Sequence, residues 1–455
     1  MVKPSSSAEI KVDPSNVPVE RSAARPVFAA KAIAVWFFFS LHYNLSFVVT
    51  ADSILPVVIY RAMPTFGAAM TESQERTTDE PANDPSKDPL RSVHTTNFPE
   101  LLRQLGASVL VTTYQAGKLV VLREDGGVLN THFRNLNKPM GLARDGGRLV
   151  VGCGIDIWEF HNVPAVCGKL DESEDYPSTS AKHDACFLPR RSHCTGDIHI
   201  HEMAYVKSET KTASNELVFV NTAFSCLAKR SEENSFEPIW RPKWIKQLAP
   251  GDNCHVNGLA ARDGQAKYVT ALGTNNEPGG WRENKRDGGL LLDVESHEII
   301  VQGLSMPHSP RWYNGKLWVL ESGEGTIGTV DLKTGKYEPI AQFPGFTRGL
   351  SFLGPLAFIG LSQVRESATF SGIPIVERLK EAEERNCGVW VLNIETGETL
   401  GFCRFEEGVQ EIFAVEVLPG VRFPDLINHD AKLVGQSYVL GDAALAEVPL
   451  ELRAK

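Results

Sequence analysis

The chain has 455 residues, of which 42% are hydrophobic and 22% are charged, a composition typical of soluble globular proteins. Its formal net charge of −10 argues against nucleic acid as a partner, because phosphate contacts need clustered Lys and Arg side chains. The eight cysteines are spread out and form no CxxC pair, which indicates free thiols in a reducing compartment and not a disulfide framework. We therefore expect a cytoplasmic protein, unless its N-terminal segment anchors it to a membrane.

The first 69 residues are an extension that we expect to lie outside the folded core. Within it, the run from Ala32 to Ala51 contains no Asp, Glu, Lys or Arg and is just long enough to span a bilayer. Composition then changes sharply at Met70, where an acidic, polar stretch begins. Three interpretations stay open: residues 32–51 are a membrane anchor, they belong to a signal peptide cleaved after Val49-Thr50-Ala51, or residues 1–69 are upstream translation that the native protein lacks.

Residues 70–98 have the composition of a disordered linker, residues 99–427 that of a folded body, and residues 428–455 form a C-terminal tail. The body is built from short apolar runs rich in β-branched and aromatic residues, separated by Gly, Asn, Asp and Pro, which is the pattern of buried strands. A strand followed by a turn and a second strand recurs every 39 to 63 residues. The six repeats begin at Met140, Glu202, Asn257, Ser309, Arg348 and Glu411.

The two ends of the body complement each other. Residues 108–133 resemble strands two, three and four of a repeat without its first strand, and residues 411–418 supply a first strand without clear successors. Pairing these segments would close an all-β ring, a six-bladed β-propeller, and would remove the exposed sheet edges. The alternatives are a β-sandwich or two smaller β domains.

The first strands of propeller blades line the central channel, so polar residues at the repeat starts should converge there. The candidate metal ligands are Glu202, Asn257, Glu411 and His201. The candidate catalytic acid–base groups are His255, His308 and Glu411. Oxygen ligands favour Ca²⁺ or Mg²⁺, whereas imidazoles favour Zn²⁺. One difficulty is that alternation along a strand directs His201 and Glu202 to opposite sides unless a bulge intervenes.

Basic residues provide the candidate ligand-binding groups, together with Asn257. Arg348 begins an inner strand, whereas Arg282 and Arg365 lie in loops that we expect at one end of the ring. An Arg side chain binds carboxylate or phosphate through its planar fork. The alternative for the two loop residues is ordinary solvent-exposed charge.

Several stretches resemble a bacterial family of conserved hypothetical proteins over about residues 100–427. They are CFLPRRSHCTGDIHIHEM, SMPHSPRW, GGWRENK, FTRGLSFLG, GLSQVRES, FSGIP and VQEIFAVEVLPG. This resemblance implies a propeller-like domain and no particular activity. The repeat starts are also similar to those of six-bladed propellers of the gluconolactonase, strictosidine-synthase and NHL-repeat kind, in which an acidic or amide side chain enters the channel. Glu202, Asn257 and Glu411 match that position, whereas Met140, Ser309 and Arg348 depart from it.

These patterns predict a site for a small polar or anionic molecule in the channel, with a divalent metal as an optional partner. Such a protein would be a binder, or a metal-assisted hydrolase of lactonase-like type, or an isomerase. The alternative function is a scaffold that binds protein partners without catalysis. The sequence has no GxGxxG in a strand–helix setting, P-loop, HExxH or GxSxG motif, which argues against the common nucleotide-dependent enzymes, zincins and α/β-hydrolases.

Overall fold

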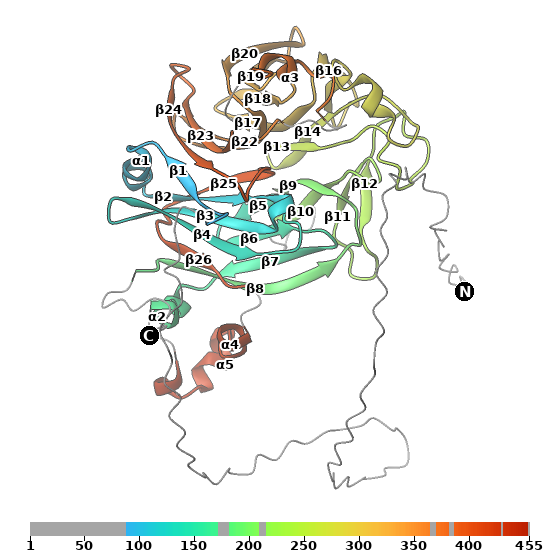
Figure 1. The fold of residues 1–455 in the computed structure, drawn as a ribbon. Coiled ribbons are helices and arrows are strands. Elements are labelled where there is room, and N and C mark those ends of the chain that lie inside the picture. Colours follow the sequence, from blue (N-terminus) through green and yellow to red (C-terminus); the bar gives the residue numbers. More distant parts are fainter. Residues whose placement is uncertain are drawn as a thin grey trace, which may run out of the picture. The chain divides into compact units, whose positions relative to one another are not determined.

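A computed structural model describes residues 88–171, 182–208, 215–364, 370–381, 386–428 and 431–453. The strands in these ranges form six small sheets, and Figure 1 shows them arranged around a common centre. The fold is therefore the six-bladed β-propeller that the repeats predict. None of the helices in the described ranges is long and apolar enough to cross a membrane, and the run 32–51 lies outside those ranges.

Each blade is an antiparallel sheet whose innermost strand comes first in the following lists. The closing blade contains β25 (Ala414–Pro419), β2 (Ala107–Thr112), β3 (Lys118–Asp125) and β4 (Val128–Asn135). The next contains β5 (Leu142–Asp145), β6 (Arg148–Gly152), β7 (Asp156–Asn162) and β8 (Ala185–Cys194), and then come β9 (Ile200–Val206), β10 (Glu216–Asn221), β11 (Cys226–Lys229) and β12 (Glu237–Trp240). The fourth contains β13 (Gly258–Arg262), β14 (Gln265–Ala271), β15 (Gly289–Asp293) and β16 (Ile299–Leu304). The last two are β17 (Pro307–Tyr313), β18 (Lys316–Glu321), β19 (Thr326–Asp331) and β20 (Lys336–Gln342), and β21 (Phe346–Leu353), β22 (Leu356–Ser362), β23 (Cys387–Asn393) and β24 (Thr399–Phe405).

Helices are few and short, and most lie in the connections. The α-helices are α1 (Phe98–Leu105), α2 (Cys167–Asp171), α3 (Pro374–Arg378), α4 (Ala431–Gly435) and α5 (Asp442–Glu447). The 3₁₀ helices are η3 (Tyr114–Ala116), η4 (Pro164–Val166), η5 (Gly280–Asn284) and η6 (Leu450–Leu452).

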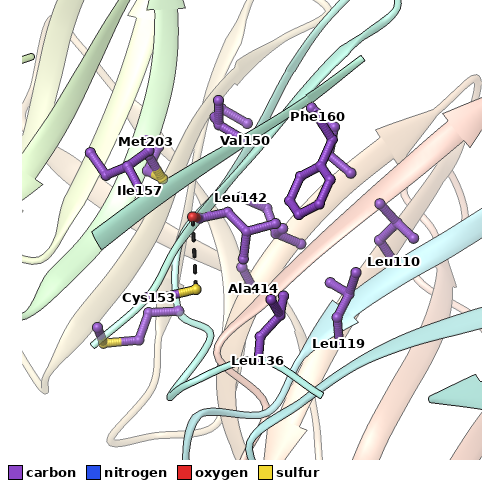
Figure 2. Close-up of a cluster of buried hydrophobic side chains, with 14 of the residues drawn as sticks. Leu110, Leu119, Leu136, Leu142, Val150, Cys153, Ile157, Phe160, Met203 and Ala414 are labelled. Carbon is purple, nitrogen blue, oxygen red and sulfur yellow. Dashed lines mark hydrogen bonds between the residues drawn. The ribbon is translucent and has the colours of Figure 1, made fainter. Parts of the chain in front are cut away.

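The second strands are buried over most of their length because each blade is covered by a neighbour on both faces. β22, with the sequence LAFIGLS, is buried along its whole length, and so is β2. Figure 2 shows the resulting packing between two blades, where Leu110 and Leu119 of the closing blade lie close to Leu142 and Phe160 of the next. The hydrophobic core is thus a set of layers between blades that surrounds the channel.

The ring closes where the sequence predicts. β25 pairs antiparallel with β2 from Ala107 opposite Pro419 to Thr112 opposite Ala414, so the two ends of the body share one sheet. In Figure 1 the red β25 accordingly lies against the blue β2. β2, β3 and β4 are the second, third and fourth strands that the sequence places within 108–133.

Hydroxyl groups at the ends of second strands fasten successive blades together. The Thr112 hydroxyl donates to the carbonyl of Met140 (2.5 Å), and that of Thr222 donates to the carbonyl of Val256 (2.6 Å). Ser322 and Ser362 repeat this bond to Thr347 (2.5 Å) and Ile412 (3.1 Å) at the start of the following blade. These bonds fix the positions of four of the six inner-strand starts, and the starts carry the channel residues.

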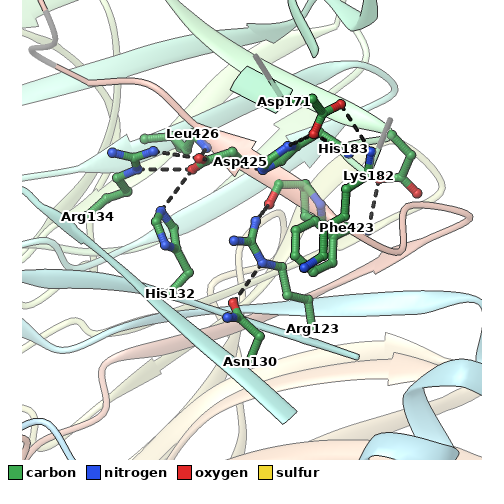
Figure 3. A network of polar contacts seen from close by, with 12 residues as sticks. Arg123, Asn130, His132, Arg134, Asp171, Lys182, His183, Phe423, Asp425 and Leu426 are labelled. Carbon is green, nitrogen blue, oxygen red and sulfur yellow. Dashed lines mark hydrogen bonds and ion pairs between the residues drawn. The ribbon is translucent and has the colours of Figure 1, made fainter. Parts of the chain in front are cut away.

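Two extra strands extend outer edges, and one of them corrects the expected linker. β1 (Ser92–His94) lies within the predicted linker 70–98, yet it pairs with β24 as a fifth strand, and Phe98 is fully buried. β26 (Pro424–Leu426) runs parallel to β8 and places Asp425 in a polar network. Figure 3 shows Arg134 and His132 meeting Asp425, with nitrogen–oxygen distances of 2.5 and 3.2 Å. The final strand is thereby tied to β4 of the closing blade.

Candidate functional site at the channel mouth

A cavity of about 260 Å³ opens at the end of the ring where the inner strands begin. The residues that line it come from the inner-strand starts and from loops around them. They are Tyr114, Met140, His199, His201, Asp252, His255, Trp281, Arg282, Met306, His308, Phe346, Arg348, Ser362, Phe370, Glu411 and Phe413. Of the residues predicted from sequence, the cavity brings together His201, His255, His308, Arg348, Glu411 and Arg282.

Two of these histidines are held by the same arrangement in different blades. Nδ1 of His201 lies 2.9 Å from the carbonyl oxygen of His199 and 2.8 Å from the Thr222 hydroxyl. Nδ1 of His308 lies 2.9 Å from both the carbonyl oxygen of Met306 and the Ser322 hydroxyl. Because a carbonyl oxygen only accepts, Nδ1 carries the proton in both rings and Nε2 carries the lone pair.

Burial keeps these two imidazoles neutral. The pKa of His201 is well below the ordinary value of 6.5, first because the ring is desolvated and then because Arg348 is near. Burial followed by the charge of Arg348 lowers the pKa of His308 in the same way. Both rings therefore act as hydrogen-bonding groups without charge at neutral pH.

The third histidine belongs to the rim. His255 directs Nδ1 at the carboxylate of Asp252 (2.9 Å), which also accepts from the indole N–H of Trp281 (3.0 Å). The Trp281 ring in turn lies beneath the guanidinium of Arg282, with Cζ 4.6 Å from the ring centroid. The loop of Arg282, which the sequence places at one end of the ring, thus joins the channel histidines in a single cavity. The Asp252 carboxylate fixes the orientation of the His255 ring.

Arg348 supplies the positive charge inside the cavity. Its guanidinium carbon lies 3.5 Å from the centroid of the Phe413 ring. Burial lowers the pKa of Arg348 to about 10, although Glu411 and Glu202 favour its charged form, so the group stays protonated at neutral pH. Within the described residues, the guanidinium has no hydrogen bond and no ion pair with a carboxylate.

Backbone strain is concentrated around the same cavity. Tyr114, His199, Asp252, His255 and Met306 line it, and each adopts a positive φ between 42° and 52°. The left-handed region costs a residue with a side chain about 1–2 kcal/mol. Such strain persists where surrounding structure enforces it, and it clusters at functional sites.

Glu202 and Asn257 are not among the lining residues, contrary to the sequence-based expectation. An extra residue lies in β9 between Ile200 and Met203, opposite Asn221 and Phe219 of β10. This bulge lets neighbouring residues both face the channel, so His201 lines the cavity while Glu202 pairs with Arg311.

Asn257 serves the fold instead of the cavity. Its amide N–H₂ donates to the carbonyl of Pro307 (3.1 Å), and its oxygen accepts from the Thr270 hydroxyl (2.7 Å). Asn257 thereby links two neighbouring blades, at the position where a Thr or Ser hydroxyl makes the corresponding hydrogen bond in other blades.

A second polar layer fills the channel further along the inner strands. Arg311 of β17 and Glu202 of β9 form an ion pair at 2.6 Å, and Arg144 of β5 faces Glu416 of β25 at 3.6 Å. Burial raises the pKa of Glu416, and the two arginines oppose that rise. Each carboxylate in this layer therefore has a guanidinium partner.

The four predicted metal ligands are therefore dispersed, since only His201 and Glu411 line the cavity. No group of three His, Cys, Asp or Glu side chains in the described ranges has an arrangement that could hold a metal ion. Arg365, the remaining predicted ligand-binding residue, lies outside the described residues.

Sequence reasoning missed the residues that orient the site. Asp252 follows a glycine in a long loop, where nothing marks its carboxylate as a partner of His255. Thr222 and Ser322 could have been found, because the repeats align as LVFVNT and LWVLES with a hydroxyl residue at the end of each. The aromatic lining residues Phe346 and Phe413 resemble ordinary core residues in the sequence.

Comparison with known protein families matches residues 96–427 to a domain of unknown function, DUF4915. No curated protein matches the chain. Among solved structures, one chain of a nidogen/laminin complex aligns with 9% identity and a TM-score of 0.42, covering 69% of this chain and 99% of that one. A protein of unknown function from Bacteroides caccae aligns with 10% identity and a TM-score of 0.41, covering 69% and 98%. The family match spans most of the chain, which accordingly belongs to the DUF4915 family.

Proposed function

We propose that this protein binds a small anionic molecule in the cavity at the channel mouth. The observation that carries the proposal is the guanidinium of Arg348, which lines the cavity and has no carboxylate partner among the described residues. The Arg348 side chain is half-buried, and a carboxylate or phosphate of a ligand would accept charge-assisted hydrogen bonds from its guanidinium. Arg282 lines the rim of the same cavity, where its guanidinium lies 3.7 Å from the carboxylate of Asp252.

The volume of the cavity and the residues that line it support a small molecule as the ligand. The volume of about 260 Å³ lies just below the range of about 300–1,000 Å³ that is usual for drug-sized ligands. Phe413, Phe346 and Trp281 provide apolar surface around a few polar groups, as small-molecule sites do. Catalytic roles for His255, His308 and Glu411 and a scaffold role for the propeller stay predictions.

Calorimetry with charged and uncharged probes of the same chain length tests whether binding requires a negative charge on the ligand. Gluconate and hexanoate are six-carbon acids, and sorbitol and 1-hexanol are their uncharged counterparts. We expect at least one acid to bind at least ~10-fold more tightly than its counterpart, because a hydrogen bond to a charged group contributes about 1.5–3 kcal/mol. Arg348→Met should abolish the difference.

Arg262→Met is the matched control, because Arg262 also stacks on an aromatic ring, that of Trp312, but does not line the cavity. It should bind as the unchanged protein does. Equal binding of acids and alcohols, or no binding of either acid, would overturn the proposal.

A further inference from the structure

The cavity presents hydrogen-bond acceptors as well as a cation. Nδ1 of His201 and Nδ1 of His308 are engaged by backbone carbonyls, so the lone pairs of both rings are on Nε2. Neither Nε2 has a hydrogen-bond partner within the described residues, and both atoms remain accessible although the rings are largely buried. His255 is oriented in the same way through Asp252.

An acceptor in a cavity wall selects for a donor in the ligand. A molecule that displaces water from Nε2 without donating a hydrogen bond leaves a buried acceptor unpaired, which weakens binding. The donor could be a hydroxyl or an ammonium group. Arg348 lies near both rings, so its charge disfavours an ammonium group at their Nε2 atoms, although the carboxylates of Asp252 and Glu411 also line the cavity. Hydroxyl groups fit both requirements.

We infer that the ligand is a hydroxylated acid, whose anionic group meets Arg348 and whose hydroxyls donate to Nε2 of His201 and His308. This inference rests on the proposed function and narrows it to one chemical class. It also assigns roles that the sequence does not suggest. His308 is a ligand-orienting acceptor, and Ser322 and Thr222 are positioning residues that fix which ring nitrogen carries the proton.

Gluconate and hexanoate test the inference, because they share length and charge and differ in hydroxyl groups. For the unchanged protein we expect gluconate to bind about 10- to 100-fold more tightly than hexanoate. His308→Phe keeps a ring of similar shape but removes the acceptor, so it should weaken gluconate binding about 10-fold or more and leave hexanoate binding unchanged. His201→Phe provides the same test in another blade, should the first variant fail to fold.

His161→Phe is the matched control, since His161 lies on β7 and does not line the cavity. It should keep the gluconate preference, as judged by calorimetry on protein with unaltered circular dichroism. If hexanoate binds as well as gluconate to the unchanged protein, the inference fails while the proposed function stands. If neither acid binds, the proposed function itself fails. A gluconate preference that survives both histidine variants would also overturn the inference.

Discussion

Individual side chains in the channel have divided roles that depend on what each one contacts. His201 and Glu202 are adjacent in the chain, yet the first lines the cavity and the second neutralises Arg311 in the layer beneath it. The bulge in β9 makes this division possible. Changes at the two positions should therefore affect different properties, ligand binding for His201 and stability for Glu202.

Glu202→Ala should destabilise the protein by about 3 kcal/mol, because it leaves the Arg311 guanidinium without its partner. Glu202→Gln keeps an acceptor near Arg311 and should cost less. Urea denaturation measures both, with the exposed Glu338→Ala as a control that should change the free energy of unfolding by less than about 0.5 kcal/mol. Equal stability of Glu202→Ala and the control would show that the ion pair is not needed.

The neutral histidines should make stability depend on pH. Folding lowers the pKa of His201 and His308 below 6.5, so below about pH 6.5 the unfolded chain binds protons that the folded protein does not. The free energy of unfolding should then fall as pH decreases, by up to about 1.4 kcal/mol per pH unit for each histidine. Urea denaturation between pH 7.5 and 5.5 should show a flatter dependence in the double variant His201→Phe/His308→Phe, and an unchanged slope would contradict this account.

The sequence predicts which residue types belong to the site better than it predicts the direction in which each side chain points. The sequence predicts His201, His255, His308, Arg348 and Glu411 for the channel and Arg282 for a loop at the rim, and all six line one cavity. The bulge in β9 is the exception to alternation that a shared site for His201 and Glu202 requires, but Glu202 pairs with Arg311 and does not line the cavity. Asn257 is engaged by an inter-blade hydrogen bond to Pro307. Such local irregularities leave no mark in the pattern of apolar residues.

At the level of elements, β26 is a short strand whose position depends on one carboxylate. Asp425 is fully buried and meets Arg134 and His132 of β4. Burial alone would raise its pKa, but the hydrogen bonds from His132 and Arg134 hold the pKa well below its ordinary value of 3.8. The network in Figure 3 therefore joins the last strand to the closing blade by charge and not by apolar packing alone.

Asp425→Asn should destabilise the protein by about 3–5 kcal/mol, since it leaves Arg134 facing a neutral group in a buried place. The stabilisation from Asp425 is present above about pH 3.8 and is lost as pH falls below it, so the variant should also lose part of the acid sensitivity of the unchanged protein. Asp263→Asn is the control, because Asp263 is exposed beside Arg262. Thermal unfolding of the unchanged protein and both variants at pH 7 and at a pH below 3.8 measures the effect.

The outer elements were harder to predict than the inner ones. Each inner strand belongs to a repeat, and six copies make the pattern visible. β1 and β26 have three residues each and occur once, so no repetition distinguishes Ser92–His94 or Pro424–Leu426 from loop sequence. Their pairing is decided by the edges of β24 and β8, which become available only in the folded ring.

For the whole molecule, stability should depend on the closing blade. Ending the chain after Gly408 removes β25 and leaves the β2 edge without its partner, so the entire ring should fail to fold cooperatively. Ending it after Gln436 removes only residues beyond α4 and should leave the thermal transition unchanged within about 2 °C. Circular dichroism and solubility distinguish the two outcomes, and a soluble, native-like product of the shorter chain would contradict the closure.

The closing blade also has a consequence for synthesis on the ribosome. Tyr114 and Phe413 line the same cavity, but about 300 residues separate them in the chain. Translation proceeds at about 5–20 residues per second, so β25 is synthesised roughly 15–60 s after its partner β2. Throughout that interval β2 exposes an apolar edge that a chaperone or another nascent chain could bind. The cavity is complete only after translation has passed Phe413, so retention of the proposed ligand would distinguish completed chains from interrupted ones.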